Sequence, residues 1–232
     1  MKINHLPKFE VTLPLSKDVV KFRPFVMKEE KLLLMAAESN DEKDVFHAID
    51  EAVKSCTFNQ VSCKTHPMVD IQYLFLQIRG KSVGEELEYN LICGECSHKT
   101  PGFLNLNAIK VSTGEGHSNV IHISDDVVVT MKYPKIQHLG RLSRSEIDVE
   151  EIYEVISECI DSIQTNEEVF SSANSSLSDM KEFVDSLTAA QFSKLQVFFD
   201  TMPSIKHTIE FECKGCGKTN KIVLDDIVNF FA

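Results

Sequence analysis

Two short cysteine pairs are the residues of this chain best suited to chemistry. One pair is Cys93 and Cys96 and the other is Cys213 and Cys216, and each has the form Cys-x-x-Cys between two runs typical of β-strands. Four thiolates from two such pairs suit one tetrahedral zinc ion. The spacing therefore predicts a single zinc site whose ligands are Cys93, Cys96, Cys213 and Cys216.

The two pairs are distant in sequence, because 116 residues separate Cys96 from Cys213. Closing a loop of that length costs about 4 kcal/mol. Structural zinc contributes on the order of 10–16 kcal/mol in small peptides, so the ion can offset the closure. Four protein ligands also leave no open position for water, and we therefore expect a structural zinc rather than a catalytic one.

Other readings of the cysteines stay open at this point. A redox pair needs its Cys-x-x-Cys at the start of a helix, where the thiol pKa falls, whereas both pairs here lie between strands. The four cysteines could also be simple buried residues, or form two separate metal sites that recruit His98 or the pair Cys63 and His66. Cys56 and Cys159 fall on apolar helix faces and are predicted to be small core residues.

Signals for catalysis are weak. Gly217-Lys218-Thr219 resembles the end of a phosphate-binding loop, but Glu212 stands where that motif requires glycine. The chain has no His-Glu-x-x-His sequence and no Gly-x-Ser-x-Gly sequence, and its eight histidines are scattered. We therefore predict that the protein is not an enzyme.

Composition is ordinary for a globular protein of 232 residues, with 43% hydrophobic and 25% charged residues. No apolar run reaches the roughly 18 residues of a membrane span, and the N-terminus lacks the apolar stretch of a signal peptide. We therefore expect the chain to stay in a reducing cytoplasm. Seven cysteines in that compartment argue against a disulfide framework.

The net charge of −11 makes nucleic acid an unexpected partner, because nucleic-acid binding usually needs a basic face. The closest approach to a basic cluster is sparse and consists of Lys132, Lys135, Arg141 and Arg144. An acidic balance is compatible with a protein that binds other proteins.

The chain also looks duplicated. Residues 13–24 and 121–134 both read as strand, Ser-x-Asp turn, strand and then proline, and helical sequence follows each. Each half then ends in strand, Cys-x-x-Cys, strand, over residues 87–106 and 208–224. Chance recurrence of hairpins is the alternative explanation.

This pattern predicts an α+β fold of two similar halves, each with a β-hairpin, helices and a zinc-ribbon-like knuckle hairpin. The first half is residues 1–111, the linker is 112–119, and the second half is 120–232. The two halves would be joined at the shared zinc site.

Periodicity and capping residues predict the helices of the first half. Residues 28–38 are rich in helix formers, and Asn40 or Asp41 can cap a second helix. A third helix is predicted over 70–79, with Gly80 as its left-handed stop.

In the second half, an apolar stripe predicts one long helix over 145–164. The polar, serine-rich residues 165–178 predict an exposed loop, and two further helices follow near 179–187 and 189–200. Residues 225–231 predict a last helical turn or two.

A series of short motifs runs through nearly the whole chain. They are Leu6-Pro7, Pro24, Glu29-Glu30-Lys31-Leu32-Leu33, Met35-Ala36, the helix 70–79 followed by Lys81-Ser82-Val83-Gly84, the two knuckles, Phe198-Phe199, Pro203 and Phe230-Phe231. In these motifs the chain resembles the baseplate hub and hub-assembly proteins of T-even-type contractile-tailed bacteriophages.

That resemblance implies a small viral protein of baseplate assembly that binds other hub or tail subunits. It would act in the cytoplasm of the infected host and would either remain in the virion baseplate or leave as a chaperone. Phe230-Phe231 and residues 165–178 are the candidate partner surfaces.

The alternative is a zinc-ribbon regulator that binds nucleic acid or polymerase. The knuckle hairpins carry residues that such a regulator would use, namely Lys99, Lys214, Lys218 and Lys221 with Phe103 and Phe211. Against the net charge of −11 this signal is weak.

Overall fold

The fold is mixed α+β, as predicted. The computed structural model describes residues 6–39, 41–138 and 149–224. The chain divides into two compact units, with unit 1 made of Met1–Ser112 and Ser204–Ala232, and unit 2 made of Thr113–Pro203. The predicted halves divide the chain differently, because residues 204–224 belong with the N-terminal unit and bring the second knuckle into the same unit as the first.

In its described residues, unit 1 combines three helices with four two-stranded antiparallel sheets. The helices are α1 (Met27–Ser39), α2 (Glu42–Cys56) and α3 (Met68–Ser82). The strand pairs are β1 (Phe9–Thr12) with β2 (Val19–Phe22), β3 (Glu86–Ile92) with β4 (Lys99–Asn105), β5 (Val111–Ser112) with β10 (Ser204–Ile205), and β11 (His207–Glu212) with β12 (Thr219–Leu224). A short 3₁₀ turn, η1 (Leu106–Ala108), follows β4.

The helices predicted for this part of the chain are confirmed, with one correction. Asp41 caps α2 by accepting a hydrogen bond from the Lys43 amide at 2.9 Å. Gly80, predicted to stop the third helix, lies inside α3, which continues to Ser82. The residue with a positive φ after the helix is instead Gly84, with φ of 124°. A glycine can occupy either position, the helix interior or the stop, so the sequence alone did not distinguish Gly80 from Gly84.

A buried aspartate fixes the first hairpin on α3. Asp70, in the first turn of α3, is fully buried and accepts hydrogen bonds from the amides of Leu15 (2.7 Å) and Ser16 (2.9 Å). Those amides lie in the turn between β1 and β2, so the carboxylate satisfies backbone donors that the hairpin itself cannot pair.

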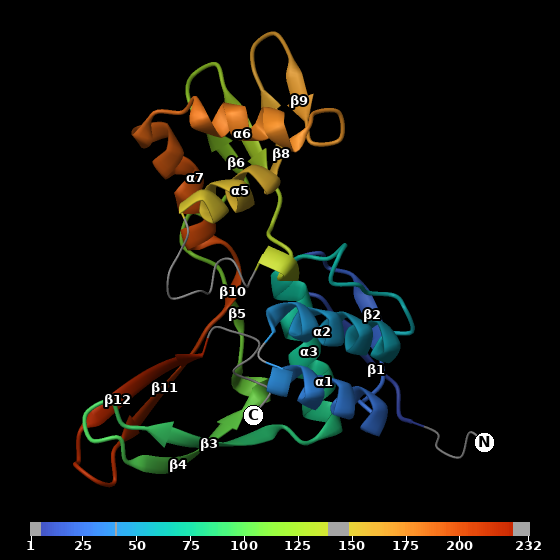
Figure 1. Cartoon of the computed structure of the whole chain (residues 1–232), viewed down its shortest axis with the longest axis vertical. Coiled ribbons are helices and arrows are strands. Elements are labelled where there is room, and N and C mark those ends of the chain that lie inside the picture. The colour runs from blue at the N-terminus through green and yellow to red at the C-terminus, as the bar shows by residue number, and fades with distance from the viewer. Residues whose placement is uncertain (1–5, 40, 139–148, 225–232) are drawn as a thin grey trace. The chain divides into compact units, whose positions relative to one another are not determined.

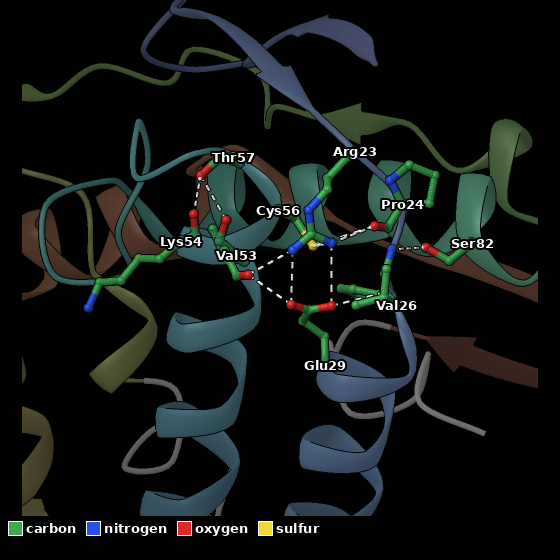
Figure 2. Close-up of polar contacts among 11 residues, drawn as sticks. Arg23, Pro24, Val26, Glu29, Val53, Lys54, Cys56, Thr57 and Ser82 are labelled. Atoms are coloured by element: carbon green, nitrogen blue, oxygen red, sulfur yellow. Dashed lines mark hydrogen bonds and ion pairs between the residues drawn. The ribbon is translucent and has the colours of Figure 1, made fainter. Parts of the chain in front are cut away.

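A second buried carboxylate joins three elements of unit 1 (Figure 2). Glu29, 3% exposed, accepts from the Arg23 guanidinium at 2.9 and 3.3 Å, from the Ser55 hydroxyl at 2.8 Å and from the Val26 amide at 2.9 Å. The Arg23 guanidinium also donates to the carbonyl of Pro24 at 2.9 Å. The chain after β2, the start of α1 and the end of α2 therefore meet at one ion pair.

The two knuckle hairpins rest on a common apolar cluster with α3. Its buried members come from α3, β3, β4, η1 and the residue after it, β10 and β12, and are Val69, Leu76, Leu87, Leu104, Leu106, Ile109, Ile205 and Leu224. Side chains from residues 69–109 and from 205–224 therefore share one core. This packing holds the bases of both hairpins in unit 1 and positions their tips.

Unit 2 is a four-stranded antiparallel sheet covered by helices (Figure 1). The sheet order is β6 (Val120–His122), β7 (Val128–Met131), β8 (Ile160–Gln164) and β9 (Val169–Ser171). The helices are α5 (Val149–Glu158), α6 (Leu177–Asp185) and α7 (Ala189–Thr201), with a 3₁₀ turn η2 (Ile136–His138). One buried cluster joins β7 and β8 to α5, α6 and α7.

The prediction of one helix over 145–164 is wrong in its C-terminal part. Helix α5 ends at Glu158, and Ile160 begins β8, which pairs with β7 through Met131↔Ile160 and Val129↔Ile163. Both isoleucines are buried in the apolar cluster of unit 2, so their apolar character fits a strand as well as a helix. Isoleucine is β-branched, and β-branched residues favour strands. Residues 145–148 lie outside the described part of the chain.

Two smaller predictions have mixed outcomes. The predicted loop 165–178 contains the short strand β9 and the first residues of α6, whereas the two helices predicted near 179–187 and 189–200 are confirmed as α6 and α7. The predicted helical tail at 225–231 lies outside the described residues. Within the ranges that are described, no helix has the length and apolar character needed to cross a membrane.

Candidate metal centre

Each Cys-x-x-Cys forms the tip of a hairpin with the same backbone geometry. The Cys93 amide donates to the His98 carbonyl (3.0 Å), and the Ser97 amide donates to the Cys93 carbonyl (2.9 Å). In the second knuckle the Cys213 amide donates to the Lys218 carbonyl (2.9 Å), and the Gly217 amide donates to the Cys213 carbonyl (2.8 Å).

The residue after the second cysteine adopts a left-handed backbone in both knuckles. The φ angles are 58° at Ser97 and 71° at Gly217. Glycine reaches this region without strain, whereas serine in the first knuckle does so at some cost.

The four cysteine sulfurs converge. All four Sγ atoms lie within 4.8 Å of one another, with 3.7 Å between Cys93 and Cys216 and 3.6 Å between Cys96 and Cys213. These distances are far longer than the roughly 2.05 Å of a disulfide, and all four cysteines are free. Sulfurs about 2.3 Å from a central tetrahedral ion lie about 3.8 Å apart, so the cluster has the size of a four-thiolate metal site.

The β3–β4 and β11–β12 hairpins lie side by side (Figure 1), and their knuckles contact each other reciprocally. The Gly94 amide donates to Asn220 Oδ1 at 3.1 Å, and the Lys214 amide donates to Thr100 Oγ1 at 3.5 Å. Gly94 and Lys214 each directly follow the first cysteine of a knuckle, while Thr100 and Asn220 each lie seven positions after it. The two hydrogen bonds are therefore equivalent under an approximate two-fold axis through the cluster.

A further pair of contacts obeys the same relation. Lys218 Nζ lies 2.9 Å from a Glu95 carboxylate oxygen, and the ring of His98 packs against Gly215. Lys218 and His98 occupy equivalent positions in the two knuckles, as do Glu95 and Gly215. The repeat predicted at the knuckles is thus visible in their geometry, whereas the wider division into two similar halves stays a prediction.

Exposure differs between the two cysteines of each pair. Cys93 and Cys213 are each 1% exposed, whereas Cys96 and Cys216 face solvent. One side of the cluster is therefore sheltered by protein, and the other gives an ion a route in and out.

Backbone donors and neighbouring sulfurs shift the thiol pKa values in opposite directions. The amides of Cys96 and then Glu95 donate to the Cys93 sulfur and lower its pKa to about 6. At Cys96 the His98 amide lowers the pKa, but the sulfurs of Cys213 and Cys216 outweigh it and raise the pKa to about 12. The Cys93 thiolate therefore forms readily, whereas that of Cys96 needs a cation to compensate repulsion from the neighbouring sulfurs.

The other three cysteines lie outside the cluster. Cys56, Cys63 and Cys159 are buried, and burial raises the pKa of Cys56 and of Cys159 to about 12 and that of Cys63 further. The prediction that Cys56 and Cys159 are core residues is confirmed. Among the described residues, the four knuckle cysteines form the one group of His, Cys, Asp or Glu side chains close enough to hold an ion, and it contains neither Cys63 nor His98.

The sequence predicted that the four cysteines lie together, but it did not identify the residues that join the two knuckles by hydrogen bonds. Thr100 and Asn220 are ordinary polar residues when each is read alone. Their common place, seven positions after the first cysteine of each knuckle, was the signal that could have identified them.

Comparison with known proteins gives a consistent result. Residues 6–232 match the family model described as T4 bacteriophage base plate protein. The chain is also similar to the baseplate hub assembly protein gp26 of Enterobacteria phage T4, with 22% identity over 224 residues that cover 97% of each chain. No solved structure matches.

Proposed function

The chain belongs to the T4 bacteriophage base plate protein family, and from that premise we propose that it is a non-enzymatic baseplate hub component or hub assembly factor. The similarity to a hub assembly protein along 97% of both chains is the observation that carries the proposal. Its action would consist of contacts with other hub or tail proteins rather than of a reaction.

We further propose that the four-cysteine cluster binds one structural Zn²⁺ ion through Cys93, Cys96, Cys213 and Cys216. Sulfur separations of 3.6 and 3.7 Å support a tetrahedral site, and thiolates are ligands that zinc favours. With four protein ligands the ion has no place for a reacting water, so its role is to hold the two hairpins together.

Glycine at position 215 is expected to matter for metal affinity. A Cβ on Gly215 would lie 2.9 Å from His98 Cγ, so Gly215→Ala forces the two knuckles apart and should weaken zinc binding about tenfold or more. Competition with a chromogenic chelator measures this change. Gly94→Ala is the matched control, because its Cβ meets nothing within 4 Å, and equal affinities for the two variants would contradict the proposed packing.

The nucleic-acid alternative has less support from the contacts of the knuckle hairpins. Lys218 pairs with Glu95 at 2.9 Å, and Lys221 pairs with Glu210 at 3.5 Å, so two of the four hairpin lysines already have acidic neighbours. These pairs leave little basic surface for a phosphate backbone. We therefore favour protein partners.

A partner surface is proposed on residues 165–178 of unit 2. Val169 and Phe170 of β9 are 64% and 43% exposed, on a strand at the edge of the sheet. Exposed apolar residues on an edge strand suit pairing with another chain. The other predicted surface, Phe230-Phe231, lies outside the described residues.

The proposed role is tested in infected cells. A tagged copy of the chain should co-sediment with hub proteins in assembly intermediates, and mass spectrometry of purified virions then separates a hub component of the virion from a chaperone that leaves. Sedimentation as a lone protein throughout infection, with baseplates forming normally in its absence, would overturn the proposal.

A further inference from the structure

A cationic pocket in unit 2 is unrelated to the metal centre. It is a cavity of about 260 Å³, open to solvent, between the end of β7, the end of α5 and the start of α6. Two half-buried lysines, Lys132 and Lys135, line it together with the hydroxyl-bearing residues Ser172, Ser175 and Ser176. Both lysines belong to the sparse basic cluster noted in the sequence.

Neither lysine is neutralised by a direct ion pair among the described residues. Lys132 Nζ donates to Ser172 Oγ at 3.1 Å, and this hydroxyl lies 3.5 Å from an oxygen of Asp161. Lys135 uses its backbone amide, which donates to His138 Nδ1 at 3.2 Å. In a chain of net charge −11, two neighbouring half-buried lysines without a direct carboxylate partner are unusual.

The other titratable groups of the pocket do not cancel this charge. The Glu158 carboxylate lies 2.9 Å from His138 Nε2, and His138 Nδ1 accepts a hydrogen bond from the Lys135 amide. Burial raises the pKa values of Cys159 and Tyr133, which keeps both side chains uncharged at neutral pH. Glu158 is the one carboxylate among the described residues that line the pocket, against two lysines, because the exposed Asp161 is not part of the lining.

We propose that this pocket binds a phosphate group. Two ammonium groups and several serine hydroxyls supply more donors than a carboxylate can accept, whereas a tetrahedral oxyanion has acceptor oxygens for all of them. The ligand is either inorganic phosphate or the phosphate of a monoester, because the chemistry that recognises the group is the same for both.

Titration of the full-length, metal-loaded protein tests this assignment at constant ionic strength. Calorimetry with inorganic phosphate should show saturable binding with a dissociation constant below about 1 mM. Lys132→Gln and Lys135→Gln should each weaken it about tenfold. Lys64→Gln, which removes the same charge from an exposed position in unit 1, should leave it unchanged.

Parallel titrations separate the sources of the phosphate. Glycerol 2-phosphate binding as tightly as inorganic phosphate indicates a phosphorylated ligand, and binding of inorganic phosphate alone indicates the free ion. Acetate binding as tightly as phosphate would overturn the assignment, as would the absence of saturable binding at millimolar phosphate or an equal loss in the Lys64 variant.

Nuclear magnetic resonance of the unmodified protein keeps the test decisive if a lysine variant does not fold. Phosphate should shift the amide signals of residues 132–135 and 172–176. Shifts confined to other residues would overturn the proposal.

Discussion

Cys96→Ser and Cys216→Ser should each abolish tight zinc binding and destabilise unit 1 by several kcal/mol. Either change leaves three thiolates, and serine is a poor zinc ligand at neutral pH. Structural zinc contributes on the order of 10–16 kcal/mol in small peptides, so loss of even part of that energy exceeds the stability margin of many domains. Zinc content by mass spectrometry and unfolding in urea measure the two effects.

The destabilisation should extend beyond the knuckles. The shared apolar cluster includes Leu87 and Leu104 from the first knuckle hairpin and Leu224 from the second, and the proposed zinc would hold the two hairpin tips together. Without the ion, the reciprocal bonds from Gly94 to Asn220 and from Lys214 to Thr100 are left to join the tips. Hydrogen bonds of this kind contribute about 1 kcal/mol each, too little to replace the metal.

A chelator separates loss of the metal from general damage. The unmodified protein should lose thermal stability when a strong chelator is added, and Cys96→Ser should not respond further. Cys63→Ala is the matched control, because Cys63 is buried outside the cluster, so this variant should be less stable yet still sensitive to chelator. Equal melting temperatures of the unmodified protein with and without chelator would contradict a structural zinc.

The local sequence was sufficient to predict an element where its local pattern and its tertiary contacts favour the same structure. A Cys-x-x-Cys between two strand-like runs predicts a hairpin tip, and both hairpins form. The Asp41 cap and the apolar spacing of α2 likewise point to the same helix. The clustering of the four sulfurs followed from chemistry alone, since one tetrahedral ion requires four ligands.

Prediction failed where a distant contact decides between two local structures. Ile160 and Ile163 continue the apolar stripe of α5, and only their pairing with Met131 and Val129 makes them a strand. Unit 1 is discontinuous in sequence because β5 pairs with β10, and all of unit 2 lies between these two strands along the chain. Strands of two residues carry no local sequence pattern from which the pairing of β5 with β10 could be predicted.

The Arg23–Glu29 pair is another feature that the sequence did not predict, since neither residue stands out among the chain's many charged residues. Glu29→Gln should lower the free energy of unfolding by about 3 kcal/mol at neutral pH, because it leaves a buried guanidinium without its counter-charge. Arg23→Met should have a similar effect by leaving the carboxylate unpaired. Urea unfolding of the full chain measures both.

An exposed ion pair provides the control for this effect. Lys81 and Glu85 lie 2.7 Å apart but are 35% and 43% exposed, so Glu85→Gln should cost less than about 0.5 kcal/mol. Equal losses for Glu29→Gln and Glu85→Gln would show that burial of the Arg23–Glu29 pair has no energetic consequence.

The pH dependence of stability gives an independent check on Glu29. Burial alone raises its pKa, but the hydrogen bonds from Arg23, the Val26 amide and Ser55 outweigh burial and lower the pKa from 4.5 to about 2. A carboxylate with a lowered folded pKa stabilises the protein above its unfolded pKa and loses that contribution as pH falls toward the folded value. A shift of this size corresponds to about 3 kcal/mol, in line with the loss expected for Glu29→Gln.

The stability difference between the unmodified protein and Glu29→Gln should therefore be largest above pH 4.5 and shrink as pH falls toward about 2. Acid also protonates the knuckle thiolates and would release zinc, but it does so equally in both proteins. This contribution cancels in the difference between them, and the remaining pH dependence of the difference belongs to residue 29. A difference that stays constant from pH 7 down to about 3 would mean that the Glu29 carboxylate does not titrate in this range, against its bonds to Arg23 and Val26.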